Sequence, residues 1–208
     1  MREENAQQGT GAWFNQRTGK LTASRMASAM SYLKGGGDSA ARKDLKIEIL
    51  AERLTDSIVP KFVNSAMQWG IDHEAMAKEA FEAKTGLKIT DVGFIDHPMI
   101  EYFGASPDGF VSDGRAIEIK CPTTSTHLKY LLNGVVSDEY KPQMCTQSAC
   151  TGKSVWFASF DPRMPKGKQL FIRLYEPTDE EIKNVESEAV KFLEEVEQMF
   201  EQLTTEEV

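Results

Sequence analysis

The sequence predicts one domain of the mixed α/β (α+β) class, with a central mixed β-sheet flanked by helices. Its 208 residues suit a single domain, 1–208. Apolar residues make up 40% of the chain, which is enough to build a core. The apolar pattern is helical at first, then alternates over three short segments, and then gives helices followed by two more alternating segments. That order differs from the strict strand–helix alternation of a doubly wound fold.

Three helices are predicted in the first half, each from a capping residue followed by apolar positions at helical spacing. They span Ala23–Leu33 after Thr22, Asp38 or Ser39 to about Asp56, and Ala66–Thr85 before Gly86. Gly86 is suited to end the third helix because glycine adopts the left-handed conformation without strain. Residues 1–12 are polar and are expected to form a flexible N-terminus.

The second half contains short alternating segments separated by turn residues. The predicted strands are Lys88–Asp96, Tyr102–Val111, Arg115–Cys121, Ser154–Phe160 and Gln169–Tyr175, with helices over Ser125–Asn133 and Asp138–Thr151. Residues 178–208 are predicted to form an acidic amphipathic helix. Its apolar stripe comprises Ile182, Val185, Ala189, Phe192, Val196, Met199 and Leu203.

A net charge of −8 by itself argues against a nucleic-acid partner, because phosphate contacts need Lys and Arg. The acidity is concentrated at the end of the chain, however. Residues 176–208 carry 12 acidic and 2 basic side chains, a net of −10, which leaves +2 on residues 1–175. Overall acidity therefore does not exclude nucleic acid as a partner.

Several classes of protein are disfavoured. The chain lacks an apolar run of about 18 residues, so no membrane span is predicted, and its first 11 residues do not resemble a signal peptide. The expected location is the cytoplasm. The three cysteines are odd in number and lack CxxC spacing, which argues against a disulfide framework, a four-cysteine zinc site and an iron–sulfur cluster. Reduced thiols are expected.

The segment most informative about chemistry is Ser106-Pro107-Asp108-Gly109, followed by Glu118-Ile119-Lys120. Side chains alternate along a strand, so Glu118 and Lys120 share one face while the flanking isoleucines point into the core. A tight turn at 112–114 places Asp108 on the preceding strand, opposite Glu118. Two carboxylates and an ammonium would then converge. The isoleucines and the Cys-Pro that follows indicate an internal strand.

Such a group suits Mg²⁺ or Mn²⁺, which prefer hard oxygen ligands. A cation there lowers the pKa of a bound water and neutralises charge in phosphoryl chemistry, while a lysine positions or deprotonates that water. The alternative is a surface hairpin with a Glu118–Lys120 ion pair, because the bare spacing also arises by chance.

Two further polar residues are candidates. Glu74 lies on a helix face that it shares with Gly70, Ala77 and Phe81, where a carboxylate needs a partner. A metal ion would serve, and the alternative is a partly exposed glutamate paired with a lysine. Gln143 follows Pro142 at a helix start and could hold the lysine, the water or a phosphate, or simply face solvent.

Six motifs occur in an order that resembles a known family. They are Trp13-x3-Arg17-x-Gly19-x2-Thr22-Ala23-Ser24, Trp69-Gly70-x3-Glu74, Ser106-Pro107-Asp108-Gly109, Glu118-Ile119-Lys120-Cys121-Pro122, Gln143 and Asp161-Pro162-Arg163-Met164. Together they resemble lambda exonuclease and the related YqaJ-like viral recombinases, a branch of the PD-(D/E)xK nucleases. The resemblance spans about Trp13 to Tyr175. It implies a restriction-endonuclease-like core and a 5′→3′ exonuclease that digests duplex DNA, leaving 3′ single strands for annealing-type recombination.

The resemblance also implies roles for individual residues. Asp108, Glu118 and the backbone carbonyl of Ile119 would bind Mg²⁺, for which Mn²⁺ would substitute, and Glu74 would complete the site directly or through water. Lys120 would act on the nucleophilic water, supported by Gln143.

A second set of residues would grip a 5′-phosphate: Arg17, Thr22, Ser24 and Ser106. Without the resemblance, a capping serine and a surface arginine would be the preferred interpretations of Ser24 and Arg17. A serine at a helix start nevertheless suits an anion, and an arginine adds a bidentate clamp. Met67 lies near the position of an apolar residue that splits the terminal base pair, although core packing explains it equally well.

The family further implies a ring-shaped homotrimer around DNA, a preference for 5′-phosphorylated ends, and a single-strand annealing protein as partner. Two alternatives remain at this point. One is a site-specific or structure-specific endonuclease, which would need a base-reading element that the sequence does not reveal. The other is a DNA-binding recombination module with a decayed site.

Overall fold

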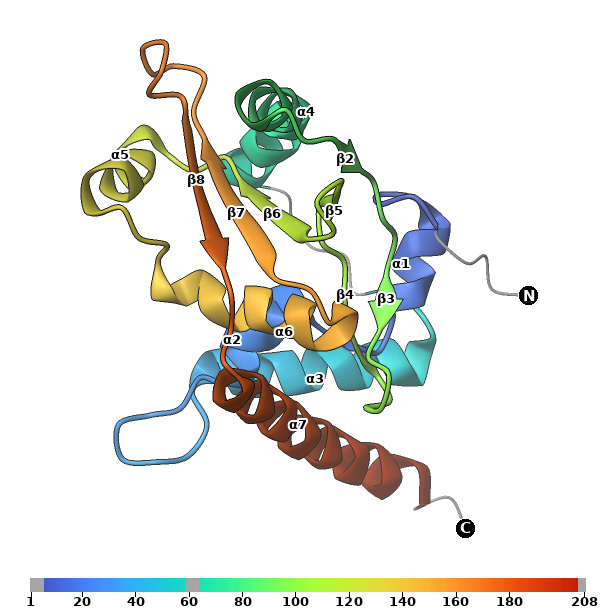
Figure 1. Ribbon diagram of the computed structural model, residues 1–208. Coiled ribbons are helices and arrows are strands. Elements are labelled where there is room, and N and C mark those ends of the chain that lie inside the picture. Colours follow the sequence, from blue (N-terminus) through green and yellow to red (C-terminus); the bar gives the residue numbers. More distant parts are fainter. Residues whose placement is uncertain (1–5, 59–63, 206–208) are drawn as a thin grey trace.

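The computed structural model in Figure 1 describes residues 6–58 and 64–205. It has a mixed α/β architecture, so the predicted fold class is confirmed. The helices are α1 (Gly11–Arg17), α2 (Met26–Ala29), α3 (Ala40–Thr55), α4 (Ser65–Thr85), α5 (Thr124–Asn133), α6 (Lys141–Thr151) and α7 (Asp179–Thr205), with 3₁₀ turns η1 (Ala23–Arg25) and η2 (Asp138–Tyr140). The strands are β1 (Leu21–Thr22), β2 (Ile89–Thr90), β3 (Ile95–Asp96), β4 (Phe103–Ala105), β5 (Gly109–Val111), β6 (Ala116–Lys120), β7 (Val155–Phe160) and β8 (Leu170–Tyr175).

The larger sheet has the strand order β2-β5-β6-β7-β8. Its middle strand, β6, pairs antiparallel with β5 and parallel with β7. A parallel pair needs a crossover connection, and α5, η2 and α6 provide it. The first four residues of β6 are buried, so it is the internal strand that its isoleucines predict. Side chains at its end are therefore held on a rigid support.

A smaller sheet, β1-β4-β3, was not predicted. The expected strands Lys88–Asp96 and Tyr102–Val111 each divide, and their halves join different sheets. Ser106 and Pro107 separate β4 from β5. Proline has no backbone N–H to donate to a ladder, so a strand ends readily there. As a result, the polypeptide passes from one sheet to the other immediately before Asp108.

The N-terminal helices also differ from expectation. The helix predicted over Ala23–Leu33 is only η1 and α2, which ends at Ala29, and Thr22 makes no capping hydrogen bond with its side chain. The helix stops early because Tyr32 forms a β-bridge with Asp38, which closes the intervening residues into a loop.

The helix α1 was not predicted at all. It begins at Gly11, inside the segment 1–12 that was expected to be flexible, and Thr10 caps it by accepting a hydrogen bond from the N–H of Trp13 at 3.3 Å. Residues 1–5 lie outside the described part of the chain. Gln8 Nε2 donates to the carbonyl oxygens of Val92 at 2.9 Å and Pro107 at 2.7 Å. The described part of this segment is therefore tied to the loops around the sheets.

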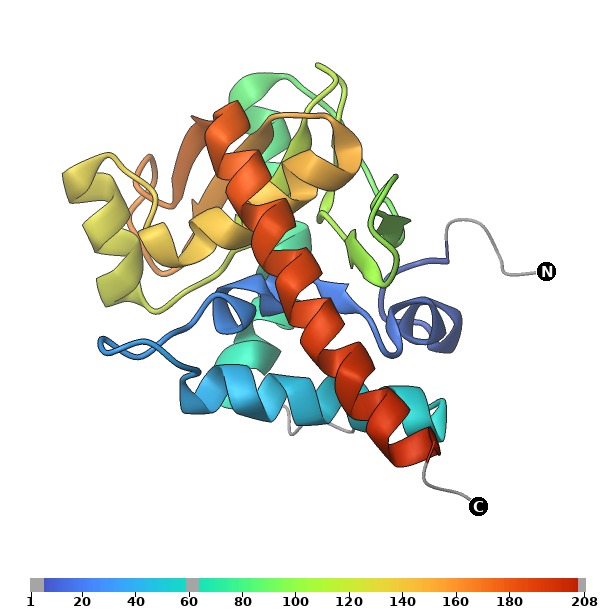
Figure 2. The ribbon, with the colours of Figure 1, turned by 90° about the horizontal axis from the view of Figure 1, so that it is seen from below.

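Helices cover both faces of the larger sheet. On one face, Ala77 and Phe81 of α4 pack against Ile117 and Ile119 of β6. Helix α6 packs on the other face, where Met144 joins the core formed by β7 and β8. Figures 1 and 2 show α3 and α7 as an outer helical layer beyond α6. None of the helices in the described residues has both the length and the apolar character required to cross a membrane.

An acidic C-terminal helix forms over Asp179–Thr205, and residues 206–208 of the predicted helix lie outside the described chain. Val185, Ala189, Phe192 and Val196 of the apolar stripe are buried, whereas Leu203 is exposed. The acids of α7 also have a structural role. Glu195 accepts hydrogen bonds from the fully buried Arg42 at 2.9 Å and from Lys46 at 3.1 Å, both on α3. Part of the terminal negative charge is thus neutralised within the fold.

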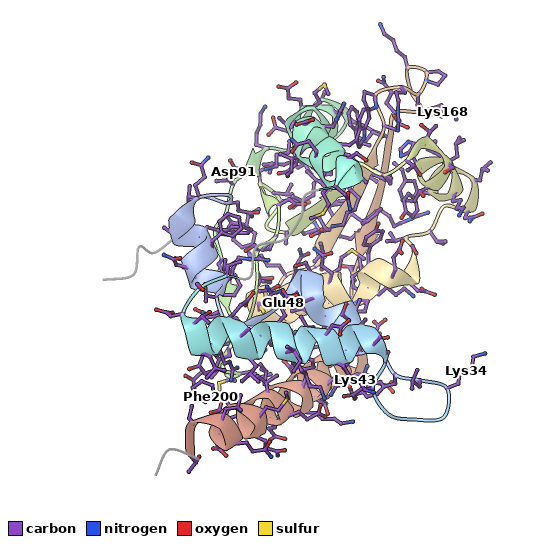
Figure 3. All side chains as sticks on the ribbon, turned by 180° about the vertical axis from the view of Figure 1, so that it is seen from behind. Lys34, Lys43, Glu48, Asp91, Lys168 and Phe200 are labelled. Carbon is purple, nitrogen blue, oxygen red and sulfur yellow. The ribbon has the colours of Figure 1, made fainter. Side chains whose placement is uncertain are left out.

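Basic side chains extend from the body at two places that Figure 3 labels, Lys34 on the loop before α3 and Lys168 on the β7–β8 hairpin.

Candidate active site

The candidate site is built where β5 begins and β6 ends. Alternate residues of a strand direct their backbone groups to opposite neighbours. The N–H of Ala116 donates to Ser154 at 3.0 Å, at the start of β7, whereas the carbonyl of Ile117 accepts from the N–H of Asp108 at 2.9 Å. Ile119 has the same parity as Ile117, so its N–H and carbonyl point to the side of Asp108.

Asp108 is fixed by this arrangement. Its Oδ2 accepts a hydrogen bond from the N–H of Ile119 at 2.6 Å. Burial raises the pKa of Asp108 well above its usual value, and the nearby carboxylates of Glu118 and Glu74 add to this effect, against the opposing charge of Lys120. A buried acid whose proton is held this firmly needs a compensating positive charge to ionise.

Glu118 is 1% exposed, and its two oxygens have separate partners. Oε1 accepts a hydrogen bond from Gln143 Nε2 at 2.7 Å and forms an ion pair with Lys120. Oε2 accepts from Gln147 Nε2. Both glutamines lie on α6, one helical turn apart. The predicted role of Gln143 near the site is thereby narrowed to a contact with Glu118.

Lys120 points to the same side as Glu118, as the strand alternation predicts. Burial alone would lower the pKa of Lys120, but the carboxylates of Glu118 and Asp108 outweigh it and raise the pKa above its usual value. The ammonium also lies 5.3 Å from the ring centroid of Tyr140. In this arrangement Lys120 is a protonated group directed at two carboxylates.

Glu74 does not lie on a packed helix face beside the other carboxylates, as a metal ligand would. Its side chain is 41% exposed and forms an ion pair with Lys78 at 3.0 Å, one turn further along α4. Lys78 also pairs with Asp91 at 2.8 Å. This is the alternative that the sequence left open for Glu74. It nevertheless lies near enough to influence Asp108 and Cys121 electrostatically.

The donors at this place fit a hard divalent cation. Asp108 and Glu118 offer carboxylates, and the carbonyl of Ile119 faces the Asp108 side beyond the last paired residue of β5. Mg²⁺ keeps several waters and uses one or two carboxylates, so this set is chemically suitable. Across residues 6–58 and 64–205, no three His, Cys, Asp or Glu side chains converge into a metal-binding group. In this arrangement Glu74 pairs with Lys78, and Glu118 is engaged by Lys120 and by the glutamines of α6.

A second polar cluster lies directly before Asp108 in sequence. Arg17 Nη1 donates to Ser106 Oγ at 3.1 Å, and Nη2 donates to Thr22 Oγ1 at 3.4 Å. Trp13 Nε1 also donates to Ser106 Oγ at 3.0 Å, and its ring lies 4.3 Å from the guanidinium. Thr22 Oγ1 lies 3.3 Å from Ser24 Oγ. The four residues predicted to grip a phosphate are thus brought together, and they form what we call the hydroxyl cradle (Arg17, Thr22, Ser24 and Ser106).

Within the described residues, Arg17 has no carboxylate of its own as an ion-pair partner, although the more distant Glu52 favours its charged form. Burial lowers the pKa of Arg17 to about 10, and repulsion from Arg25 contributes. The group still carries its charge at neutral pH. A partly buried guanidinium surrounded by hydroxyls is a suitable partner for an anion such as a phosphate.

The structure differs from the prediction at Ser24 in this cluster, and it settles where Met67 lies. Ser24 lies in η1, a turn of three residues, and not at the start of a long helix, so the helix dipole contributes little there. Met67 lies in the first turn of α4 and is 46% exposed. Its side chain is therefore available on the surface and is not part of the core.

The sequence reasoning missed Gln147 and left the Asp161-Pro162-Arg163 motif without a role. The four-residue spacing of Gln143 and Gln147 was the available signal for the first. Asp161 is buried and accepts hydrogen bonds from Arg163 Nε at 2.8 Å and Nη2 at 3.0 Å. The guanidinium of Arg163 in turn lies 4.3 Å from the ring of Trp69 on α4. The motif thus links the β7–β8 hairpin to the helix that carries Glu74.

Comparison with known proteins identifies the fold. The crystal structure of an alkaline exonuclease, LHK-Exo, from Laribacter hongkongensis is 42% identical, with a TM-score of 0.87, and the match covers 94% of this chain and 97% of that one. The same relative has also been crystallised in complex with dAMP. A phage-related exonuclease from Haemophilus somnus 129PT shares the fold at 15% identity and a TM-score of 0.66, covering 88% of this chain and 96% of that one. No curated protein matches the chain.

The architecture is therefore the nuclease fold of the alkaline exonucleases. Residues 12–154 match the family model of the YqaJ-like viral recombinase domain. The chain belongs to this YqaJ-like viral recombinase family, and the resemblance seen in its six motifs is confirmed.

Proposed function

We propose that the protein is a Mg²⁺-dependent deoxyribonuclease that digests one strand of linear duplex DNA from its 5′ end. Family membership supports a DNA exonuclease role. The observation that carries the finer proposal is the short connection between the two clusters: Ser106 of the hydroxyl cradle and Asp108 are two residues apart in the segment that joins β4 to β5. Their Cα atoms can therefore be at most about 7 Å apart. A terminal phosphate held by the cradle would leave the next phosphodiester close to the carboxylates.

The chain's own groups have distinct parts in this reaction. Asp108, Glu118 and the carbonyl of Ile119 would hold the cation, with Glu74 joining directly or through a water if it releases Lys78. When bound, the divalent cation supplies a more acidic water and neutralises phosphate charge. Lys120 orients the attacking water and adds positive charge beside the phosphate. Gln143 and Gln147 keep Glu118 in position.

The cradle would select the end of the strand. Arg17 would bind a 5′-phosphate through its guanidinium fork, and the hydroxyls of Ser106, Thr22 and Ser24 would donate to the remaining oxygens. Met67, exposed at the start of α4, would contact the terminal base pair. The relative crystallised with dAMP binds a deoxynucleoside monophosphate, which supports a nucleotide site in this fold.

The wider proposals follow the family. They are a homotrimeric ring around DNA, a single-strand annealing protein that receives the 3′ tail, and a cytoplasmic location.

The test is to incubate linear duplex DNA with the protein and Mg²⁺, using 5′-phosphorylated and 5′-hydroxyl ends that carry a label on either the 5′ or the 3′ terminus. We expect early release of 5′-labelled mononucleotides, retention of the 3′ label, and faster digestion of phosphorylated ends. Closed circular DNA is the control and should stay intact. Cutting of the circle would favour an endonuclease, and binding without digestion would favour a module with a decayed site.

A further inference from the structure

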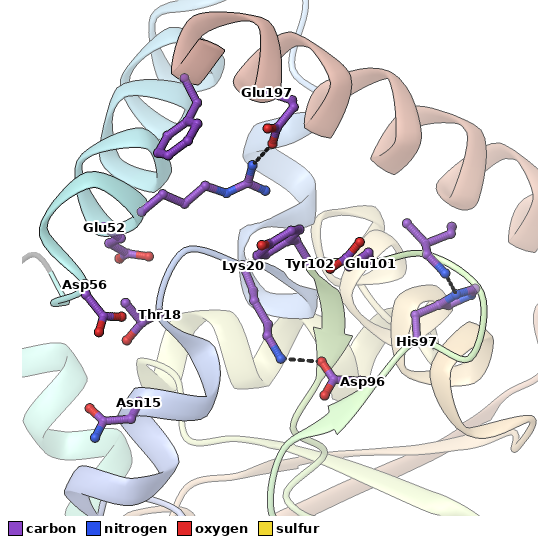
Figure 4. Close-up of a pocket in the computed structure, with 13 residues that line it drawn as sticks. Asn15, Thr18, Lys20, Glu52, Asp56, Asp96, His97, Glu101, Tyr102 and Glu197 are labelled. Carbon is purple, nitrogen blue, oxygen red and sulfur yellow. Dashed lines mark hydrogen bonds and ion pairs between the residues drawn. The ribbon is translucent and has the colours of Figure 1, made fainter. Parts of the chain in front are cut away.

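A cavity of about 490 Å³ lies between the ends of α1 and α3, the β3–β4 turn and the end of α7 (Figure 4). It shares no lining residue with the candidate active site or the hydroxyl cradle. Most of its polar groups are charged. The acids that line it are Glu52, Asp56, Asp96, Glu101 and Glu197, and the basic residues are Lys20 and Arg53.

Three of these acids are already neutralised. Figure 4 shows Lys20 paired with Asp96 and a dashed contact at Glu197, which Arg53 Nη1 makes at 2.7 Å. Glu52 is fully buried and accepts hydrogen bonds from Arg25 Nη1 at 3.0 Å and the N–H of Gly19 at 3.0 Å.

Two acids at the cavity have no such partner. Asp56 and Glu101 are exposed, and neither forms an ion pair with any residue of the ranges 6–58 and 64–205. They lie in different elements, Asp56 at the C-terminal end of α3 and Glu101 in the β3–β4 turn. After internal pairing the cavity therefore keeps two acids that form no ion pair within the described chain, of which Glu101 lies close enough to Arg53 to favour its charged form.

Arg53 provides an independent observation. Its side chain is only 8% exposed, its Nε donates to the carbonyl of Gly19 at 3.0 Å, and its guanidinium lies 4.1 Å from the ring of Tyr102. Tyr102 holds this place in a left-handed conformation, with φ of 57°, which a non-glycine residue adopts only at a cost. Arg53 Nη2 is buried but makes no hydrogen bond within the described chain. A buried donor in this state needs an acceptor oxygen.

The two acids and the unpaired Arg53 Nη2 together restrict the kind of ligand that the cavity can bind. A free anion would satisfy Arg53 but would be repelled by Asp56 and Glu101. A simple cation would satisfy the acids but would leave Arg53 Nη2 unpaired. A peptide with basic side chains offers both groups, because each residue carries a carbonyl acceptor beside its cationic side chain.

We propose that this cavity binds a basic segment of a partner protein, with Lys or Arg side chains against Asp56 and Glu101 and a main-chain carbonyl on Arg53 Nη2. The volume of about 490 Å³ accommodates a long side chain with its adjoining backbone.

The experiment follows the side-chain Nε–H resonance of Arg53 in the ¹⁵N-labelled protein, assigned with the variant Arg53→Lys. The probes are acetyl-Gly-Lys-Gly-Lys-Gly-amide, the same peptide with Glu in place of Lys, spermidine, and inorganic phosphate. We expect a saturable shift with the lysine peptide, and responses at least about ten-fold weaker with the other three. No shift with the lysine peptide would overturn the proposal. An equal response to spermidine or to phosphate would show a site for charge alone.

The variant D56N/E101Q should weaken binding of the lysine peptide by about ten-fold, because it removes two partly exposed ion pairs. Its matched control is D179N/E180Q, which removes the same charges from exposed positions at the start of α7 and should bind the peptide like wild type. An equal loss in both variants would indicate a general charge effect and count against the cavity. DNA digestion should be unchanged in either, so this result is independent of the nuclease proposal.

Discussion

The carboxylate of Asp108 accepts a hydrogen bond from the backbone N–H of Ile119 at 2.6 Å. This contact fastens the start of β5 to the end of β6, between Glu118 and Lys120. The fold itself therefore holds one acid beside the strand that carries the other. A backbone donor is also indifferent to most side-chain substitutions, so the role of Asp108 in catalysis can be separated from its role in structure.

The first prediction concerns Asp108→Asn. An asparagine oxygen can still accept from Ile119, so the thermal midpoint should change little. Loss of the negative charge should lower nuclease activity by at least about 100-fold, since even residues that merely support metal ligands contribute 10- to 100-fold. The measurement is the initial rate of mononucleotide release, with circular dichroism as the folding control. Activity within a few-fold of wild type would remove Asp108 from the site.

The second prediction concerns Gln147, which donates to the buried Glu118. Gln147→Met keeps the volume but removes the donor, so Glu118 should be held less firmly. We expect kcat/KM to fall by about 10- to 100-fold and the Mg²⁺ concentration for half-maximal rate to rise. The control is Gln198→Met, at an exposed position of α7. If the rate falls without any change in Mg²⁺ requirement, Gln147 has only a packing role.

The third prediction concerns Arg17. Arg17→Ala should abolish the preference for 5′-phosphorylated ends, whereas the rate on 5′-hydroxyl ends should change less than about three-fold. Arg17→Lys is the matched variant, and it should restore part of the preference because it keeps the charge but loses the bidentate fork. The measurement is the ratio of initial rates on the two substrates. A ratio that stays at the wild-type value in Arg17→Ala would locate end recognition elsewhere.

The strands of the site were predictable because alternation in the Glu118–Lys120 segment defines which side chains share a face. The contacts made by the helices around the site were harder to predict. Gln147 depends on the register between α6 and β6, which the sequence of neither element specifies. For Glu74 the sequence left open either a metal ion or a lysine as partner. In the folded helix Lys78 lies four residues further on, which places its ammonium within reach of Glu74.

The fourth prediction is a pH dependence of stability at Asp161. Burial alone would raise the pKa of Asp161, but hydrogen bonds from Arg163 and Thr124 outweigh it and lower the pKa to about 2. An unfolded aspartate titrates near pH 4. The stabilisation by ionised Asp161 is therefore complete above about pH 4 and is lost as the pH falls through about 2. The free energy of unfolding of Asp161→Asn should fall below that of wild type at pH 5 to 7.

This difference should shrink as the pH approaches 2, and urea unfolding at pH 7, 5, 3 and 2 measures it. A difference that does not vary with pH would mean that the loss comes from packing alone. Asp179→Asn, an exposed position on α7, serves as the control and should show no such trend.

The fifth prediction concerns the cysteines. Cys145 and Cys150 are free and buried, and burial raises the pKa of each thiol to about 12. Only the thiolate reacts with iodoacetamide, so at pH 8 both should be alkylated about 1,000-fold more slowly in the native protein than in urea. Mass spectrometry of timed samples gives the rates. Native rates close to the denatured ones would show that these thiols are accessible.

The N-terminal region illustrates a second limit of prediction. A helix pattern over Ala23–Leu33 was reasonable in local terms, but the Tyr32–Asp38 bridge ended it early. Likewise, α1 is too short to show a clear period, and its position depends on Trp13 and Arg17 reaching Ser106 across the fold. A short loop closed by the bridge decided the first case and a contact between distant segments decided the second, whereas the fold class followed from periodicity alone.

The ion pairs between α3 and α7 have a consequence for how the chain tolerates truncation. Arg42 has no access to solvent, and its charge is compensated by Asp38 and by Glu195 of α7. A shortened protein that lacks α7 would lose one of the two carboxylate partners of Arg42 and would expose an apolar surface on α3, so it would be prone to aggregate. Helix α7 is therefore needed to cover the apolar face of α3, so an affinity tag can be attached after it but cannot replace it.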